Sequence, residues 1–242
     1  MATIDCETIA YRAGDLRMQG SVYRDAGRHE GPAVLLFPEA PGPGANVRSR
    51  AERLASAGYT AFVSDLHGHA DVITDRAEMI QRMEVLRGSA EITRMRARAA
   101  LDALVNHRGG RTGGIAAIGF CFGGTMALEL GRDGAELGAI IGFHSGLRPL
   151  GSPDSGPMRG PVLVCIGADD PSITIEDRMA FEAEMQGRSA QWSLHVYGGV
   201  RHSFTDTNAD QIGRPEFARY DATADLESWA AMSRLLSRTI GV

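Results

Sequence analysis

Residues 115–124 read Ile-Ala-Ala-Ile-Gly-Phe-Cys-Phe-Gly-Gly, and this stretch indicates the fold of the chain more strongly than any other. Its first four residues are an apolar run of the kind that forms a strand buried on both faces. Apolar residues then recur with helical spacing and stop near Gly131. The stretch therefore predicts a buried strand that turns sharply into a helix, with Cys121 at the turn.

The glycines on either side of Cys121 suit a strand-to-helix elbow. Such an elbow strains the backbone of the residue at its tip, so the residues two positions before and after must be small. Gly119 and Gly123 meet this requirement. We expect Cys121 to be a nucleophile, and the alternative is a small buried cysteine that fills a tight turn.

Two more residues with catalytic chemistry follow predicted strands. Residues 161–166 form a second buried strand and lead to Asp169 and Asp170, whereas His202 lies in the loop after the alternating residues 192–197. The carboxyl ends of parallel strands meet at one edge of an α/β sheet, and the order cysteine, aspartate, histidine is that of α/β hydrolases. We expect His202 to be the base and Asp169, rather than Asp170, to orient its imidazole.

With these segments the chain resembles the dienelactone hydrolase family of α/β hydrolases over nearly its whole length. The resemblance rests on residues 37–42, 119–124, 167–169 and 202–204. It implies a Cys121, His202 and Asp169 triad. It also implies that Glu39 lies beside the thiol and influences its charge, and that the backbone N–H of Ala40 forms an oxyanion hole. Glu39 as a helix cap or a solvent-facing residue is the alternative.

The second oxyanion donor is expected from the elbow itself. The backbone N–H of Phe122 begins the elbow helix, where N–H groups lack helical partners and favour negative charge. Together with the thiol, this arrangement predicts attack of Cys121 on a small ester, lactone or thioester, a covalent thioester intermediate, and its release by water. The same arrangement suits other activated acyl or phosphoryl substrates.

The residues that contact substrate are less clearly indicated. The family that the chain resembles binds a substrate carboxylate with arginines, one of them shortly after the catalytic histidine, but here Asp206 follows His202. The charge is reversed, which argues against a dienelactone as substrate. Candidates for substrate contact or for modulating the thiol are His144, Phe204 and Arg82, and a packed, hydrogen-bonded His144 is the alternative. Further arginines that either bind an anion or lie solvated are Arg76, Arg214 and Arg219.

The rest of the chain alternates between strands and helices. Strands are expected at residues 8–12, 16–23, 33–37, 59–64 and 139–143, and helices at residues 47–57, 92–103, 175–185 and 224–240. The first two strands predict an antiparallel hairpin. The whole predicts one α/β-hydrolase domain over residues 1–242, in which helices cover both faces of a mostly parallel sheet. Residues 67–88 are charged and poorly patterned, and we expect a small cap or mobile loop there.

The helix expected near residues 92–103 has one apolar stripe and several arginines. The stripe consists of Ile92, Met95, Ala99 and Ala103. The arginines are Arg94, Arg96 and Arg98, which we expect to be solvated.

Composition excludes several classes of partner. The formal net charge is -5 and the basic residues are scattered, so nucleic acid is not an expected ligand. The sequence contains no apolar run of about 18 residues, so a membrane-spanning helix is not predicted. The N-terminal residues 1–7 are acidic and lack the basic start of a signal peptide, so we expect a cytoplasmic protein. Of the three cysteines, Cys165 lies in an apolar strand and is expected to be core. Oligomeric state is not predicted.

Two alternatives to a thiol hydrolase stay open at this point. His67, His69 and Asp71 have the H-x-H-x-D spacing of dinuclear metallohydrolases, but Val72 stands where that motif continues with histidine. We therefore expect a solvated loop and no cofactor. The other alternative is a non-catalytic binding protein on a hydrolase scaffold, because a fold does not guarantee activity.

Overall fold

The computed structural model describes residues 2–28, 31–151 and 156–241, and its strands form one eight-stranded sheet in the order β1-β2-β4-β3-β5-β6-β7-β8. The strands are β1 (Ile4–Ala13), β2 (Leu16–Asp25), β3 (Ala33–Phe37), β4 (Thr60–Val63), β5 (Ile115–Phe120), β6 (Ala139–Phe143), β7 (Val162–Gly167) and β8 (Trp192–Tyr197). Strands β3 to β8 are parallel, whereas β1 and β2 form a hairpin that joins β4 antiparallel. The predicted α/β-hydrolase fold with an N-terminal hairpin is confirmed.

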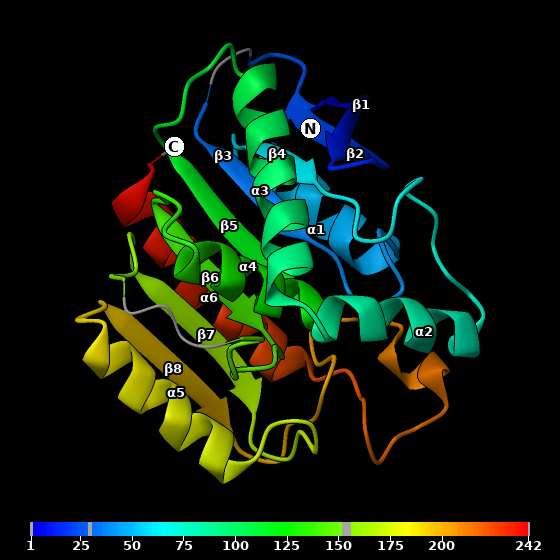
Figure 1. Ribbon diagram of the computed structural model, residues 1–242, viewed down its shortest axis with the longest axis vertical. Coiled ribbons are helices and arrows are strands. Elements are labelled where there is room, and N and C mark those ends of the chain that lie inside the picture. Colours follow the sequence, from blue (N-terminus) through cyan, green and yellow to red (C-terminus); the bar gives the residue numbers. More distant parts are fainter. Residues whose placement is uncertain (1, 29–30, 152–155, 242) are drawn as a thin grey trace.

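Helices lie on both faces of this sheet (Figure 1). They are α1 (Ala45–Ser56), α2 (Arg76–Arg87), α3 (Ala90–His107), α4 (Phe122–Arg132), α5 (Ile175–Gly187) and α6 (Ala222–Thr239), with a short 3-10 helix at Ala209–Ile212. Helices α1 and α6 pack against one face, and α3, α4 and α5 against the other, each with its own apolar core. Strands β3, β5, β6 and β7 are buried at every position, which explains their unbroken apolar sequences. Over the described residues, every helix is too short or too polar to span a bilayer.

The segment at residues 67–88 contains more regular structure than its sequence pattern indicated. A loop leads to α2, which buries Met83 and Leu86. The side chain of Asp75 caps this helix by accepting the backbone N–H of Glu78 at 2.7 Å. The Asp-x-x-Glu pattern that begins at Asp75 therefore marks the start of α2, which the apolar periodicity did not indicate.

Helix α3 corrects two predictions. Its buried face matches the expected stripe only in part: Ala103 is buried and Ile92 packs against the core, but Met95 is 41% exposed. Ala97, Ala100 and Leu104, which are outside the stripe, are fully buried. Its arginines are not simply solvated either, since all three bind other segments. Arg94 pairs with Glu129, Arg96 donates to the carbonyl of Leu66, and Arg98 pairs with Asp133. The helix is rotated by about one position from the predicted face, so that small side chains approach the core and Arg94 reaches a buried partner.

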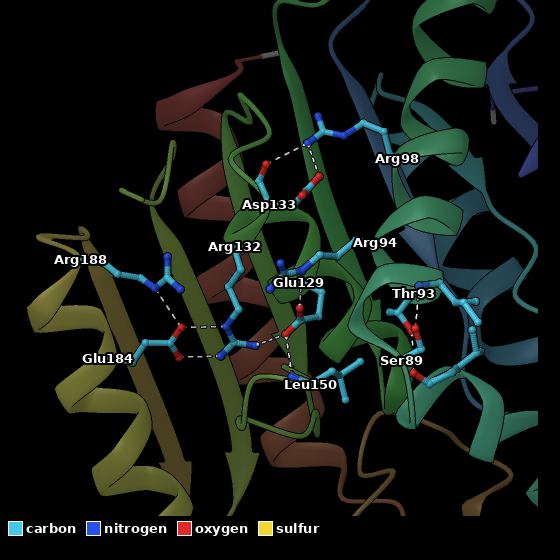
Figure 2. A network of polar contacts seen from close by, with 12 residues as sticks. Ser89, Thr93, Arg94, Arg98, Glu129, Arg132, Asp133, Leu150, Glu184 and Arg188 are labelled. Carbon is cyan, nitrogen blue, oxygen red and sulfur yellow. Dashed lines mark hydrogen bonds and ion pairs between the residues drawn. The ribbon is translucent and has the colours of Figure 1, made fainter. Parts of the chain in front are cut away.

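A buried ion network fixes α4, the helix that follows the Cys121 elbow (Figure 2). Glu129 on α4 is fully buried, binds Arg94 at 2.8 Å and Arg132 at 3.0 Å, and accepts the N–H of Leu150 at 3.1 Å. Arg132 continues the network to Glu184 on α5 at 2.7 Å. Three helices and a loop therefore depend on one carboxylate.

Removing the Glu129 carboxylate should lower the urea concentration at which the protein unfolds. We expect Glu129→Gln to cost about 3 to 5 kcal/mol of unfolding free energy, because Arg94 and Arg132 lose their charged partner in a dry environment. The measurement is the urea midpoint followed by circular dichroism.

The matched control is Glu136→Gln, which breaks the exposed pair between Glu136 and Arg159. This substitution should leave the midpoint nearly unchanged, because water screens exposed pairs. Equal midpoints for the two variants would contradict the assigned role of the buried network.

Candidate active site

Cys121 lies at a strained turn between β5 and α4. Its φ of 55° and ψ of -122° are unusual for a residue with a side chain, and such strain persists only where the surroundings enforce it. The glycines supply the space that the turn needs. A Cβ atom at Gly119 would lie 2.0 Å from the carbonyl oxygen of Gly123, and one at Gly123 would lie 2.2 Å from that of Phe37. The predicted elbow and the requirement for both glycines are confirmed, and the Cys121 side chain is partly exposed.

His202 lies in the loop after β8 and is buried between the elbow and a carboxylate. Its Nδ1 is 2.7 Å from Oδ2 of Asp170. The other carboxylate oxygen of Asp170 accepts the Ser172 hydroxyl at 2.6 Å and the Ser172 N–H at 2.9 Å. The ring of His202 also lies 4.9 Å from that of Phe217, centroid to centroid. These contacts leave the other ring nitrogen to face Cys121, with which His202 shares a side-chain hydrogen bond.

The carboxylate that holds His202 is Asp170, not Asp169 as predicted. The two residues lie in the turn that follows β7, and the backbone N–H of Asp169 donates to the carbonyl of Val200 at 3.0 Å. The turn leaves the Asp169 side chain exposed, whereas Asp170 is only 3% exposed and points at the imidazole. The sequence located the turn correctly, but chose the wrong one of two adjacent aspartates.

The electrostatics of the site favour an ion pair between sulfur and imidazole. Burial raises the pKa of the Cys121 thiol, but the charge and hydrogen bond of His202 outweigh it and lower the pKa overall. Burial also lowers the pKa of His202, yet the negative sulfur and Asp170 raise it to about 10. Burial raises the pKa of Asp170, but its bonds to His202 and Ser172 outweigh burial and lower that pKa overall. The arrangement therefore shifts the thiol toward thiolate and the imidazole toward imidazolium, beside the carboxylate of Asp170.

The two expected oxyanion donors lie on either side of the thiol. The backbone N–H of Ala40 makes a hydrogen bond to the Cys121 sulfur, and Phe122 is the first residue of α4. The carbonyl of Ala40 is held in turn by Nε2 of His67 at 2.7 Å. The sequence singled out His67 only for its metal-like spacing, so its contact with this loop was missed.

Glu39 precedes Ala40 in the same loop and faces the site. Its Oε1 accepts the side-chain N–H of Asn46 at 2.5 Å. Burial raises the pKa of Glu39, and the negative charge of Asp206 adds to this, although the Asn46 bond acts in the opposite direction. The charge of Glu39 also raises the pKa of Cys121, so the two groups influence each other as the family resemblance implied.

Two of the proposed substrate contacts lie beneath the site instead. Phe204 is fully buried, and its ring packs edge-on against the His144 ring, with 5.3 Å between the two ring centroids. His144 is also fully buried, and its Nδ1 accepts the backbone N–H of Cys121 at 3.1 Å. The prediction that Phe204 touches substrate is therefore wrong in this structure, and the packed alternative holds for His144.

Arg82 forms an ion pair within its own helix, and the two histidines of the H-x-H-x-D loop differ in burial. Arg82 is part-exposed on α2 and pairs with Glu78 at 2.6 Å. His67 is buried against Ala40, whereas His69 is exposed. Nowhere in residues 2–28, 31–151 and 156–241 do three histidine, cysteine, aspartate or glutamate side chains converge as metal ligands. Through His67, the H-x-H-x-D loop supports the Ala40 loop.

Comparison with known proteins agrees with this geometry. A model of the dienelactone hydrolase family matches residues 18–240. The chain belongs to this family. A dienelactone hydrolase-like promiscuous phosphotriesterase from metagenomic libraries is 40% identical, with a TM-score of 0.94 over 100% of both chains. The structure called "m3DLH" is 41% identical, with a TM-score of 0.93 over 98% of this chain and 99% of its own.

Curated relatives of this dienelactone hydrolase family member are more distant. A Bradyrhizobium protein named "Probable 2-oxo-3-(5-oxofuran-2-ylidene)propanoate lactonase" is 27% identical over 190 residues, which cover 72% of this chain and 73% of that protein. Family membership makes the chain a hydrolase of esters or lactones, as the sequence predicted.

The two adjacent aspartates provide a matched test of the site. We expect Asp170→Asn to lower kcat by about 10³ to 10⁴, because the amide cannot stabilise the imidazolium or hold its tautomer. Asp169→Asn should keep wild-type kcat, since that side chain is exposed. The measurement is steady-state ester hydrolysis by both purified variants. The assignment fails if Asp169→Asn is the inactive one.

Proposed function

We propose that this protein hydrolyses small, uncharged esters and lactones through Cys121, by way of a thioester intermediate. The observation that carries the proposal is the hydrogen-bonded row of Cys121, His202 and Asp170 at the elbow. A thiolate is the nucleophilic form of cysteine, and this row favours that form at neutral pH. The reducing environment expected for a cytoplasmic protein would keep the thiol free.

The first half of the reaction forms the thioester. The Cys121 sulfur attacks the carbonyl carbon, a C–S bond forms, and the carbonyl oxygen becomes an oxyanion. The N–H groups of Ala40 and Phe122 stabilise that oxyanion, and a donor of this type contributes about 3 to 4 kcal/mol. The oxyanion then re-forms the carbonyl and expels the alkoxide, which takes the proton of His202.

The second half restores the thiolate. Water gives a proton to the now neutral His202 and its oxygen attacks the thioester carbon. The C–S bond breaks, the carboxylic acid leaves, and Cys121 and His202 return to the ion pair. Asp170 stays ionised throughout and stabilises the imidazolium at the start and end of the cycle.

The charges around the site support uncharged substrates. The negative charge of Asp206 raises the pKa of Glu39, and the charge of Glu39 raises the pKa of Cys121, so acidic side chains lie near the thiol. Arg82, the arginine predicted to contact substrate, is already paired with Glu78. A carboxylate on the substrate would meet two acidic side chains, whereas a neutral ester would not.

A phosphotriester is the second candidate substrate. The observation that favours it is the 40% identity, over the full chain, to a dienelactone hydrolase-like promiscuous phosphotriesterase. The same sulfur would attack phosphorus, the P–O bond to the leaving group would break, and water would then cleave the S–P bond. The oxyanion donors would face a phosphoryl oxygen in place of a carbonyl oxygen.

One series of assays tests both candidates. The substrates are p-nitrophenyl acetate, p-nitrophenyl butyrate and diethyl p-nitrophenyl phosphate, and the proteins are wild type, Cys121→Ala, His202→Ala and the control Cys6→Ala, each with and without EDTA. We expect the wild type and the control to turn over the esters, because Cys6 is exposed and outside the site. Both active-site variants should fall to background, and EDTA should have no effect.

The outcomes separate the alternatives. Ester turnover that survives in Cys121→Ala, or that EDTA abolishes, overturns the thiol mechanism. Inactivity of the wild type toward all three substrates favours a binding protein. Turnover of the phosphotriester that is lost in Cys121→Ala establishes the second activity at the same thiol.

A further inference from the structure

His144 joins the elbow to the loop that carries His202. It follows β6, and its Nδ1 accepts the backbone N–H of Cys121 at 3.1 Å, a proton that the carbonyl of Phe143 shares at 3.0 Å. On the other side of the ring, Nε2 lies 2.8 Å from Oγ1 of Thr205. Thr205 is the third residue after His202 and is 1% exposed. One imidazole therefore contacts the nucleophile's own backbone and the loop of the base.

Thr205, which contacts Nε2 of His144, is itself anchored to other elements. The guanidinium of Arg50 donates to the carbonyl of Thr205 and pairs with Asp225 at 2.9 Å, which ties the loop to α1 and α6. Oδ1 of Asn46 accepts the Nε–H of Arg50 at 3.2 Å, and Nδ2 of Asn46 donates to Oγ1 of Thr205 at 3.4 Å. Thr205 thus has little freedom to move relative to the core.

The charge state of His144 follows from its surroundings. Burial lowers its pKa well below the ordinary value, and the positive charges of His202 and Arg50 add to this. The rings of His144 and His202 meet edge to face, with 5.2 Å between centroids. His144 is therefore neutral beside a charged His202. Since Nδ1 accepts from Cys121, its proton is on Nε2 and is donated to Thr205.

We propose that His144 is a positioning residue, which fixes the distance between the Cys121 elbow and the His202 loop through its bonds to Cys121 N–H and Thr205 Oγ1. The inference rests on the proposed thiol chemistry. Its physical basis is that a proton transfer between sulfur and imidazole is sensitive to displacements of about 1 Å. Packing alone does not account for the residue, because a wholly apolar side chain would fill a site lined by Phe120 and Phe204.

The backbone conformation of His144 also supports a positioning role. Its φ is 39°, in the left-handed region that costs free energy for a residue with a Cβ atom. Cys121 and Ser203, which flank the same contact, also have a positive φ of 55° each. Three of the six non-glycine residues with positive φ in the described part of the chain therefore lie where the elbow and the His202 loop meet.

The test uses three variants and one control. His144→Phe keeps the ring and removes both bonds. His144→Asn keeps an acceptor at the position of Nδ1 and tolerates positive φ, but cannot reach Thr205. Thr205→Val keeps the shape and removes Oγ1, so it answers the question even where His144→Phe folds poorly. The control is Thr93→Val, a fully buried threonine whose hydroxyl binds the carbonyl of Leu86 at 2.8 Å, on a different helix.

The readouts are kcat per alkylatable Cys121, KM for p-nitrophenyl acetate, and the urea midpoint. We expect kcat to fall about 10- to 100-fold in His144→Phe, with KM within about twofold of wild type, because alignment and not substrate binding is lost. His144→Asn and Thr205→Val should lie between His144→Phe and wild type. The double variant of His144→Phe and Thr205→Val should be no slower than His144→Phe, since both break the same link. Thr93→Val should lower only the urea midpoint.

The proposal is overturned if kcat per titrated site is unchanged in both His144→Phe and Thr205→Val, or if Thr93→Val lowers it equally. That failure is distinct from failure of the proposed function. Full activity in Cys121→Ala would remove the thiol mechanism, whereas an inactive Cys121→Ala beside fully active His144 variants would remove this inference alone.

Discussion

A thiol and an imidazole, each of which burial alone would keep neutral, shift each other's pKa toward the charged form in this protein. Burial raises the pKa of Cys121 and lowers that of His202, and their mutual attraction reverses both shifts. Such a pair is favourable only if its geometry is held closely, because the desolvation of two charges must be offset. The main structural features of the protein can be understood as ways of holding this pair.

Each partner is held from a different part of the fold. The elbow of Cys121 is fixed at its start by glycines that allow backbone contact, and α4 is fixed further along by the buried carboxylate of Glu129. His202 is held by Asp170, and its loop is tied to α1 and α6 by Arg50. The short apolar strands of the sheet place these loops at one edge, as in other open α/β sheets.

The features that the sequence predicted well are those determined by local backbone chemistry. An unbroken apolar run such as that of β5 forms a buried strand wherever both faces are covered, and Gly119 and Gly123 are readable because no side chain fits there. The choice between Asp169 and Asp170 was wrong, because it depends on the rotation of one turn, which neither residue reveals. For the Cys121 elbow and for the turn that carries the two aspartates, the sequence located the turn to within one residue.

The features that the sequence did not reveal come from contacts between distant segments. Arg94 was expected in solvent because its partner, Glu129, is 35 residues away on another helix. Phe204 closely follows His202 in the sequence and His144 follows a predicted strand, so both were expected near substrate. Both side chains are buried instead, and His144 links Thr205 to the elbow. Proximity along the chain located the active-site loops, but not the direction of each side chain.

The ionisation of Cys121 is the property to measure first. The rate of alkylation of Cys121 by iodoacetamide should be followed against pH in a Cys6→Ser background, for wild type and for His202→Asn. We predict that the wild-type thiolate persists well below about pH 8.5, the ordinary thiol pKa. His202→Asn should raise the pKa of Cys121, because the strongest influences that oppose burial are then lost. A wild-type thiol that titrates at the ordinary pKa, and does not respond to His202→Asn, would contradict the ion pair on which this account of the protein rests.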